Sequence, residues 1–156
     1  MDKNEVLTQL RTAKAAHIKW LQKAKLLITG IEVDENAIPI DSTECNFGKW
    51  FYSEGQMLNA LSNNPIESMK EIESLHSKLH DKYLKIFSIF FAKDKKTGFF
   101  AQLFGKKRKD PSTAEQELAK EYYSEMEKIS QDLLDAINKL ERRLVAVSDE
   151  KIKTLV

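Results

Sequence analysis

Two of the three histidines in this 156-residue chain, His76 and His80, stand four residues apart. On a helix this spacing places both imidazoles on one face, with their Cβ atoms about 5–6 Å apart. One metal ion can then accept a nitrogen from each ring at roughly 2.0–2.1 Å. The spacing alone is a weak signal, because two ordinary polar helix residues give the same pattern. It indicates half of a candidate metal site.

The other half can come only from a few residues, because the chain holds one further histidine, His17, and a single cysteine, Cys45. Three imidazoles and one thiolate make a complete tetrahedral zinc set. In the alternative interpretation His17 is a hydrogen-bonded core histidine, Cys45 is a small buried hydrophobic residue, and the other two histidines lie at the edge of a helix. Three separate elements would then each direct a scarce ligand inward. Burying three imidazoles without partners would cost several kcal/mol.

Length and charge limit the class of protein. A chain of 156 residues fits one domain with its own core, so we predict a single domain over residues 1–156. The 25 Lys and Arg against 24 Asp and Glu give no charge excess that would indicate a nucleic-acid partner. Residues 1–5 are charged rather than signal-like, and no apolar stretch is long enough to span a bilayer. We therefore expect a cytoplasmic protein with no nucleic-acid binding and no membrane insertion.

The elements that must position the candidate ligands are helices, because apolar residues recur every three or four positions. The first helix covers residues 4–28 and should end near Gly30. A shorter helix begins close to Cys45, and a third follows Pro65 and carries both remaining histidines. Ser112 and Glu115 form a capping box that opens a last helix.

These helices predict an all-α fold, a four-helix bundle with short additional helical segments and the zinc site inside the bundle. Residues 112–147 form the long closing helix. Residues 94–111 form a linker or an insertion before it. Aromatic side chains are expected to wall the site with apolar surface, namely Trp20, Phe47, Trp50, Phe51, Tyr83 and Phe87.

Three motifs hold the candidate ligands in order along the chain. They read His17-Ile18-Lys19-Trp20-Leu21, then Cys45-Asn46-Phe47-Gly48-Lys49-Trp50-Phe51, then His76-Ser77-Lys78-Leu79-His80. They resemble the successive motifs of the CZB domain, the chemoreceptor zinc-binding family, whose pattern is His-x-x-Trp-Leu, Cys-x-Phe-Gly-x-Trp and His-x-x-x-His. The resemblance covers the chain from the first through the third helix, and the last helix resembles the family's closing helix.

This resemblance implies a helical homodimer in which each subunit binds one Zn2+ through His17, Cys45, His76 and His80. Members of the family usually accompany bacterial chemoreceptor signalling helices or a diguanylate cyclase domain, so a partner of either kind is expected, as in chemotaxis. The chain contains neither output domain. It therefore resembles the regulatory module standing alone, or a part of a larger protein.

The expected function is regulatory or sensory, with zinc occupancy or oxidation of Cys45 coupled to helix packing and signalling. Four protein ligands close the zinc shell, and no His-Glu-x-x-His motif supplies a general base, so we expect no enzyme activity. Glu44 either orients a histidine or is a solvated residue of the connection. The alternative function is a structural helical interaction protein without a metal-dependent role.

Overall fold

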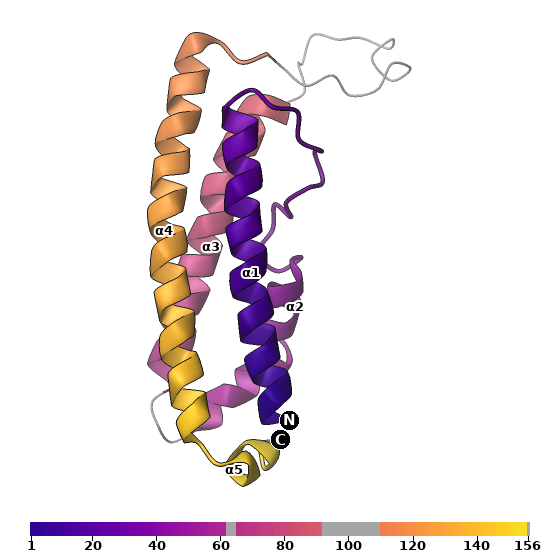
Figure 1. Cartoon of the computed structure of the whole chain (residues 1–156), viewed down its shortest axis with the longest axis vertical. Helices are drawn as coiled ribbons and strands as arrows, with labels where there is room; N and C mark the ends of the chain where they lie inside the picture. Colours follow the sequence, from indigo (N-terminus) through magenta and orange to yellow (C-terminus); the bar gives the residue numbers. More distant parts are fainter. Residues whose placement is uncertain (62–64, 92–109, 156) are drawn as a thin grey trace.

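The computed structural model describes residues 1–61, 65–91 and 110–155, and every regular element among them is helical. The elements are α1 (Lys3–Ile28), α2 (Asn46–Phe51), the 3₁₀ helix η1 (Glu54–Ala60), α3 (Pro65–Phe91), α4 (Thr113–Ala146) and α5 (Asp149–Lys153). The three long helices α1, α3 and α4 lie side by side, and α2 lies beside α1 (Figure 1). The predicted all-α bundle is confirmed, with the short α2 and η1 standing where a fourth long helix would lie.

α1 begins and ends where the sequence predicts. The Asp2 carboxylate accepts the backbone N–H groups of Asn4 and Glu5, which have no partner inside the helix. At the other end Gly30 has a φ of 91°, in the left-handed region that glycine adopts without strain. One face of α1 is buried, and His17 belongs to it together with Val6, Leu7, Leu10, Ala13, Ala24 and Leu27.

The core lies between the long helices. α1 and α3 run in the same direction and α4 returns antiparallel to both, with α3 and α4 forming the most extensive pair (Figure 1). Each fully buried aliphatic side chain in this core contributes about 1.5–3 kcal/mol relative to its exposed state. Those from the three helices include Leu10, Ile72, Ile86, Leu133 and Ile137.

α4 opens with the capping box that the sequence predicts. The N–H of Glu115 donates to Ser112 Oγ over 3.3 Å, and the N–H of Ser112 donates to the Glu115 carboxylate over 2.8 Å. The segment 94–111, predicted as a linker or an insertion, falls outside the described residues as far as residue 109. The closing helix itself runs to Ala146, next to the predicted end at Val147.

The connection between α1 and α2 is part of the folded core. Ile38 is buried and Ile40 is half-buried against the bundle. The Asp41 carboxylate accepts both the N–H and the hydroxyl of Thr43, which forms a local turn before Cys45. The connection therefore places Cys45 against the bundle in a defined backbone conformation.

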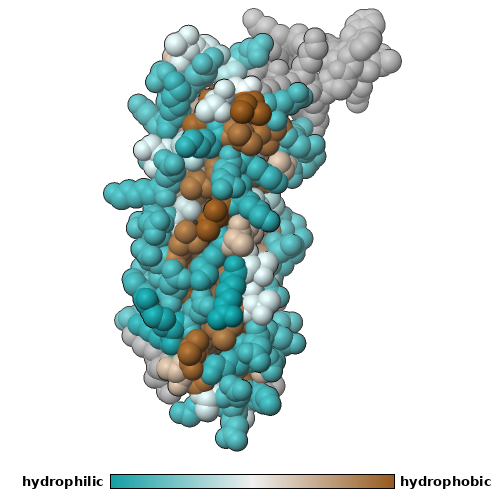
Figure 2. Space-filling view, in the orientation of Figure 1, coloured by the Kyte–Doolittle hydropathy of each residue, from teal (hydrophilic) through white to brown (hydrophobic). Residues whose placement is uncertain are grey.

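The face of the molecule that Figure 2 shows is mostly hydrophilic. Figure 2 shows a narrow apolar stripe running along the face that α1 and α4 share, with hydrophilic side chains on both sides of it. No helix among the described residues combines the length and the apolar character that crossing a bilayer requires. Apolar residues are thus concentrated where the amphipathic helices meet.

Candidate metal centre

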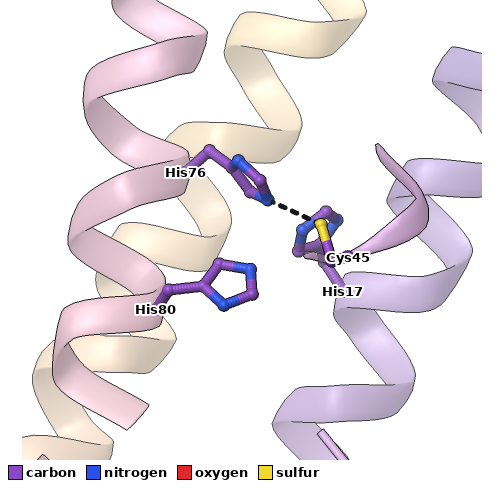
Figure 3. Close-up of side chains that lie close together, drawn as sticks. All are labelled: His17, Cys45, His76 and His80. Atoms are coloured by element: carbon purple, nitrogen blue, oxygen red, sulfur yellow. Dashed lines mark hydrogen bonds between the residues drawn. The ribbon is translucent and has the colours of Figure 1, made fainter. Parts of the chain in front are cut away.

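Four side chains from three elements meet inside the bundle (Figure 3). His17 comes from α1, Cys45 lies directly before α2, and His76 and His80 occupy successive turns of α3. One ligand atom of each residue lies within 4.8 Å of every other, and all four residues are at most 3% exposed. The structure therefore brings together every residue that the sequence singled out as a candidate ligand.

The spacing of the ligand atoms suits a small cation. A tetrahedral zinc ion with bonds of roughly 2.0–2.3 Å separates its ligand atoms by about 3.3–3.6 Å. Cys45 Sγ and His76 Nε2 already lie 3.3 Å apart. The widest pairs would have to close by roughly 1 Å, which small side-chain rotations can supply. The residues therefore fit a His/Cys zinc site both in type and in position.

Two of the imidazoles are oriented by backbone carbonyls. His17 Nδ1 lies 2.6 Å from the carbonyl oxygen of Ala13, and His80 Nδ1 lies 2.9 Å from that of Pro39 and 3.3 Å from that of Ile40. Because a carbonyl can only accept, Nδ1 carries the proton in both rings and Nε2 keeps its lone pair. Both Nε2 atoms are buried without a hydrogen-bond partner among the described residues. A metal ion would satisfy both.

His76 is oriented differently. Its Nε2 faces Cys45 Sγ, while its buried Nδ1 has no hydrogen-bond partner among the residues that the structure describes. The ring is surrounded by other rings, with centroids 5.0 Å from His17, 5.0 Å from Phe47 and 4.7 Å from His80. Ring packing and the contact with Cys45 Sγ, rather than a carbonyl acceptor, therefore hold this third imidazole.

Burial keeps the imidazoles neutral. Removal from water lowers the pKa of His17 to about 4, against a smaller opposing effect of the Ala13 carbonyl. It lowers the pKa of His76 to about 2, to which repulsion by the other two imidazoles adds. The pKa of His80 is also lowered by burial, although the Pro39 and Ile40 carbonyls oppose the shift. Near neutral pH the imidazoles are therefore ready to bind a cation without first losing a proton.

Cys45 is the N-cap of α2. Its Sγ accepts the N–H of Gly48 over 3.1 Å and lies 3.4 Å from the carbonyl oxygen of Ser42. Burial raises the pKa of the thiol, and the N–H groups of Gly48 and Phe47 offset part of that rise. Without a cation the thiol therefore keeps its proton, and binding of a metal must release it.

Of the aromatic residues predicted to wall the site, Trp20 and Phe47 contact the imidazoles of the cluster. The Trp20 ring lies 4.5 Å from His17 and 5.3 Å from His80, measured between centroids, and Phe47 lies 5.8 Å from His17. Trp50 and Phe51 pack against Phe47 in turn. Tyr83 and Phe87 were predicted to wall the site as well, but they contact each other further along α3, and for them this stays a prediction. This apolar shell excludes water, which strengthens electrostatic interactions inside it.

The groups that orient the imidazoles were not among the sequence predictions. Glu44 is exposed and pairs with Lys49 at 3.7 Å, as expected of a solvated connection residue. The acceptors are instead backbone carbonyls. Helical periodicity alone could have indicated Ala13, which stands four residues before His17. Nothing in the sequence indicated Pro39 and Ile40, because their proximity to α3 depends on the path of the connection.

Fold and cluster together define an all-helical protein with a buried His/Cys centre able to hold a metal ion. The family model of the chemoreceptor zinc-binding domain, CZB, matches residues 17–87, so this part of the chain is similar to that domain. The match begins at His17 and includes Cys45 and both histidines of α3, whereas α4 lies beyond it. No curated protein and no solved structure matches the chain.

Proposed function

We propose that this chain is a zinc-binding regulatory domain in which His17, Cys45, His76 and His80 hold one Zn2+. The buried cluster carries the proposal, because three neutral imidazoles and a thiol converge on one point. The Nε2 atoms of His17 and His80 have no hydrogen-bond partner among the described residues. One sulfur and three nitrogen ligands suit tetrahedral zinc, and the match of residues 17–87 to the CZB family model supports zinc as the ion.

When bound, zinc would link elements that otherwise associate through packing alone. His17 belongs to α1, Cys45 precedes α2, and α3 supplies the other two ligands. The connection before Cys45 also contacts α3, because Pro39 and Ile40 accept the Nδ1 proton of His80. We therefore propose that occupancy changes the packing of α1, α2 and this connection against α3. A signalling partner in contact with these elements would respond.

Oxidation of Cys45 would provide a second input. The thiolate attacks the O–O bond of hydrogen peroxide, so that sulfur gains one oxygen, a hydroxide ion leaves and two electrons pass from sulfur to the peroxide. The resulting sulfenic acid is a poorer metal ligand than the thiolate. Cys45→Ser should weaken zinc binding and abolish the oxidant response together. An unchanged oxidant response in that variant would reject this mechanism.

We further propose that the chain pairs with a second copy and acts in the cytoplasm on a bacterial chemoreceptor or a diguanylate cyclase. The apolar stripe shared by α1 and α4 supports the pairing (Figure 2). Large apolar side chains that these helices expose to solvent, by 39–56%, are Ile18, Leu26, Leu118 and Val145. Analytical ultracentrifugation should find a dimer, and Ile18→Lys should shift it toward the monomer. A monomer at all accessible concentrations would contradict the pairing.

A regulatory role is proposed in preference to hydrolysis, because four protein ligands leave no position for water or substrate. The second candidate function is a structural interaction protein, which the exposed apolar side chains of α1 and α4 also suit. In that case the buried imidazoles would be tolerated core residues. The two functions differ in one measurable property, the metal content of the purified protein.

Metal analysis of the full chain therefore tests the proposal. We expect about one zinc per chain, as a closed four-ligand site binds a single ion, and loss of that zinc in His80→Ala. Tyr83→Phe is a matched control, since Tyr83 is buried one turn from His80 and its hydroxyl has no partner among the described residues. This control should keep its zinc. A wild-type chain without metal under non-chelating conditions would support the structural alternative.

A further inference from the structure

We propose that Gly48 positions the Cys45 thiol for metal binding. The inference rests on the proposed zinc function and identifies what holds the sulfur at the cluster. Gly48 lies in the first turn of α2 and does not have a positive φ, so its backbone conformation suits any residue. The requirement for glycine must therefore come from its surroundings.

Those surroundings are the backbone of the preceding turn. A Cβ atom at position 48 would overlap the carbonyl oxygen of Ser42 and lie 2.9 Å from its carbonyl carbon and 3.2 Å from Thr43 Cα. All three are backbone atoms, so no side-chain rotation relieves the contact. Any larger residue at position 48 would push the turn and α2 apart.

Cys45 lies in sequence between these two segments, and its sulfur contacts both. Sγ accepts the N–H of Gly48 over 3.1 Å, lies 3.4 Å from the Ser42 carbonyl oxygen, and from there reaches His76 Nε2 at 3.3 Å. We name residues 42–48 the thiol turn. The Ser42 and Gly48 ends of this turn approach each other closely, because Gly48 has no side chain, and the sulfur lies between them. Moving the two ends apart would therefore shift the sulfur relative to the imidazoles.

A second glycine offers a matched control. A Cβ atom on Gly55, in η1, would lie 3.2 Å from the carbonyl oxygen of Trp50 and 3.4 Å from its ring. These contacts are tight, but shifts of a few tenths of an ångström relieve them. They involve none of the four cluster residues. Gly55→Ala thus makes the same chemical change on a neighbouring helix outside the thiol turn.

Cobalt(II) binding to the full chain separates loss of the thiolate from loss of the whole site. The visible d–d bands report any tetrahedral coordination, whereas the near-ultraviolet charge-transfer band requires sulfur on the metal. We expect Gly48→Ala to lose most of the charge-transfer band, keep d–d absorption from the imidazoles, and bind zinc about 10–100-fold more weakly. Gly55→Ala should retain the band and its zinc affinity. An undiminished band in Gly48→Ala would overturn the proposal.

A double-mutant cycle distinguishes positioning from a general structural role. If Gly48 acts through the thiol, Gly48→Ala should have no further effect on zinc affinity in a chain that already carries Cys45→Ala. A purely structural role would add its own loss to that of the thiol. Additive losses would therefore overturn the inference, and a silent Gly48→Ala in the Cys45→Ala chain would support it.

The wild-type chain provides a test that needs no substitution, in case Gly48→Ala fails to fold. With an NMR-active cadmium isotope in the site, the Gly48 amide proton should show scalar coupling to the metal through Sγ. Cadmium bound without that coupling would refute the positioning role alone. A wild-type chain that binds no metal would instead refute the proposed function, so the two failures are distinguishable.

Discussion

The charge state of each cluster residue is set by its burial. His17 and His76, with pKa values of about 4 and about 2, are neutral near neutral pH, and the Cys45 thiol is protonated. Four polar side chains can therefore lie in the core without an unpaired buried charge. Acidification would favour protonation of the buried imidazoles, and the unpaired charges would then destabilise the folded state.

The metal-free protein should lose stability as the pH falls below about 6.5, the ordinary pKa of histidine. Down to about pH 4 the unfolded chain binds protons that buried His17 does not, so the free energy of unfolding decreases with decreasing pH. Each buried histidine contributes up to about 1.4 kcal/mol per pH unit. Glu141, whose pKa is lowered by hydrogen bonding to Lys14, adds a loss only below its ordinary value of 4.5.

Urea unfolding of the metal-free chain at about pH 7 and about pH 5 measures this dependence. His17→Leu replaces one imidazole with an apolar side chain of similar size and should reduce the difference between the two conditions. Equal unfolding free energies at both pH values in the wild type would show that the imidazoles are not buried in the neutral form.

The short α2 depends on one aromatic anchor. Phe47 is 4% exposed, contacts His17 and His76, and packs against Trp50 and Phe51. An isolated helix of this length is unstable in water, so tertiary contacts must hold it. The anchor therefore affects both the stability of the fold and the position of the cluster.

Phe47→Ala should lower the free energy of unfolding by about 3–5 kcal/mol and weaken zinc binding, because it removes packing from α2 and from two imidazoles. Chemical denaturation and chelator competition measure the two effects. Met57→Ala, at a partly exposed position of η1, is the control and should cost only about 0.5 kcal/mol. If Phe47→Ala bound zinc with the affinity of the wild type, the packing of α2 would have no effect on the site.

The capping box of α4 should act on stability alone. Ser112→Ala removes the hydroxyl that accepts the N–H of Glu115 and should cost about 1 kcal/mol in the free energy of unfolding. Zinc affinity should not change, because the cluster draws no residue from α4. Ser124→Ala, exposed within the same helix, should be neutral or slightly stabilising. A loss of zinc affinity in Ser112→Ala would contradict this expectation and show that the start of α4 influences the site.

For the molecule as a whole, zinc should act as a stabilising ligand that joins α1, the start of α2 and α3. Free zinc at a hundredfold excess over its dissociation constant should raise the free energy of unfolding by about 2.7 kcal/mol. Thermal unfolding with and without a chelator measures this difference. His80→Ala should show little of it, and an equal zinc effect in that variant would place the binding elsewhere.

The fold class and the identity of the cluster residues could be predicted from the sequence because both depend on local pattern. Apolar residues at helical spacing define one buried face, and Gly30 and Ser112 mark helix ends through contacts within a few residues. The cluster residues could be predicted because the chain has only three histidines and one cysteine, which leave few possible ligand sets. Helix positions, helix ends and candidate ligands all depend on residues within short stretches of the chain.

Only the tertiary structure decided how the site is built. The contact of His80 with the Pro39 and Ile40 carbonyls joins residues about forty positions apart, and the approach of Ser42 to Gly48 depends on how the thiol turn is seated. Carbonyl positions of this kind follow from the path of the whole backbone, and residue types do not encode them locally. The four cluster residues could therefore be predicted from the sequence, whereas the orientation of each side chain required the fold.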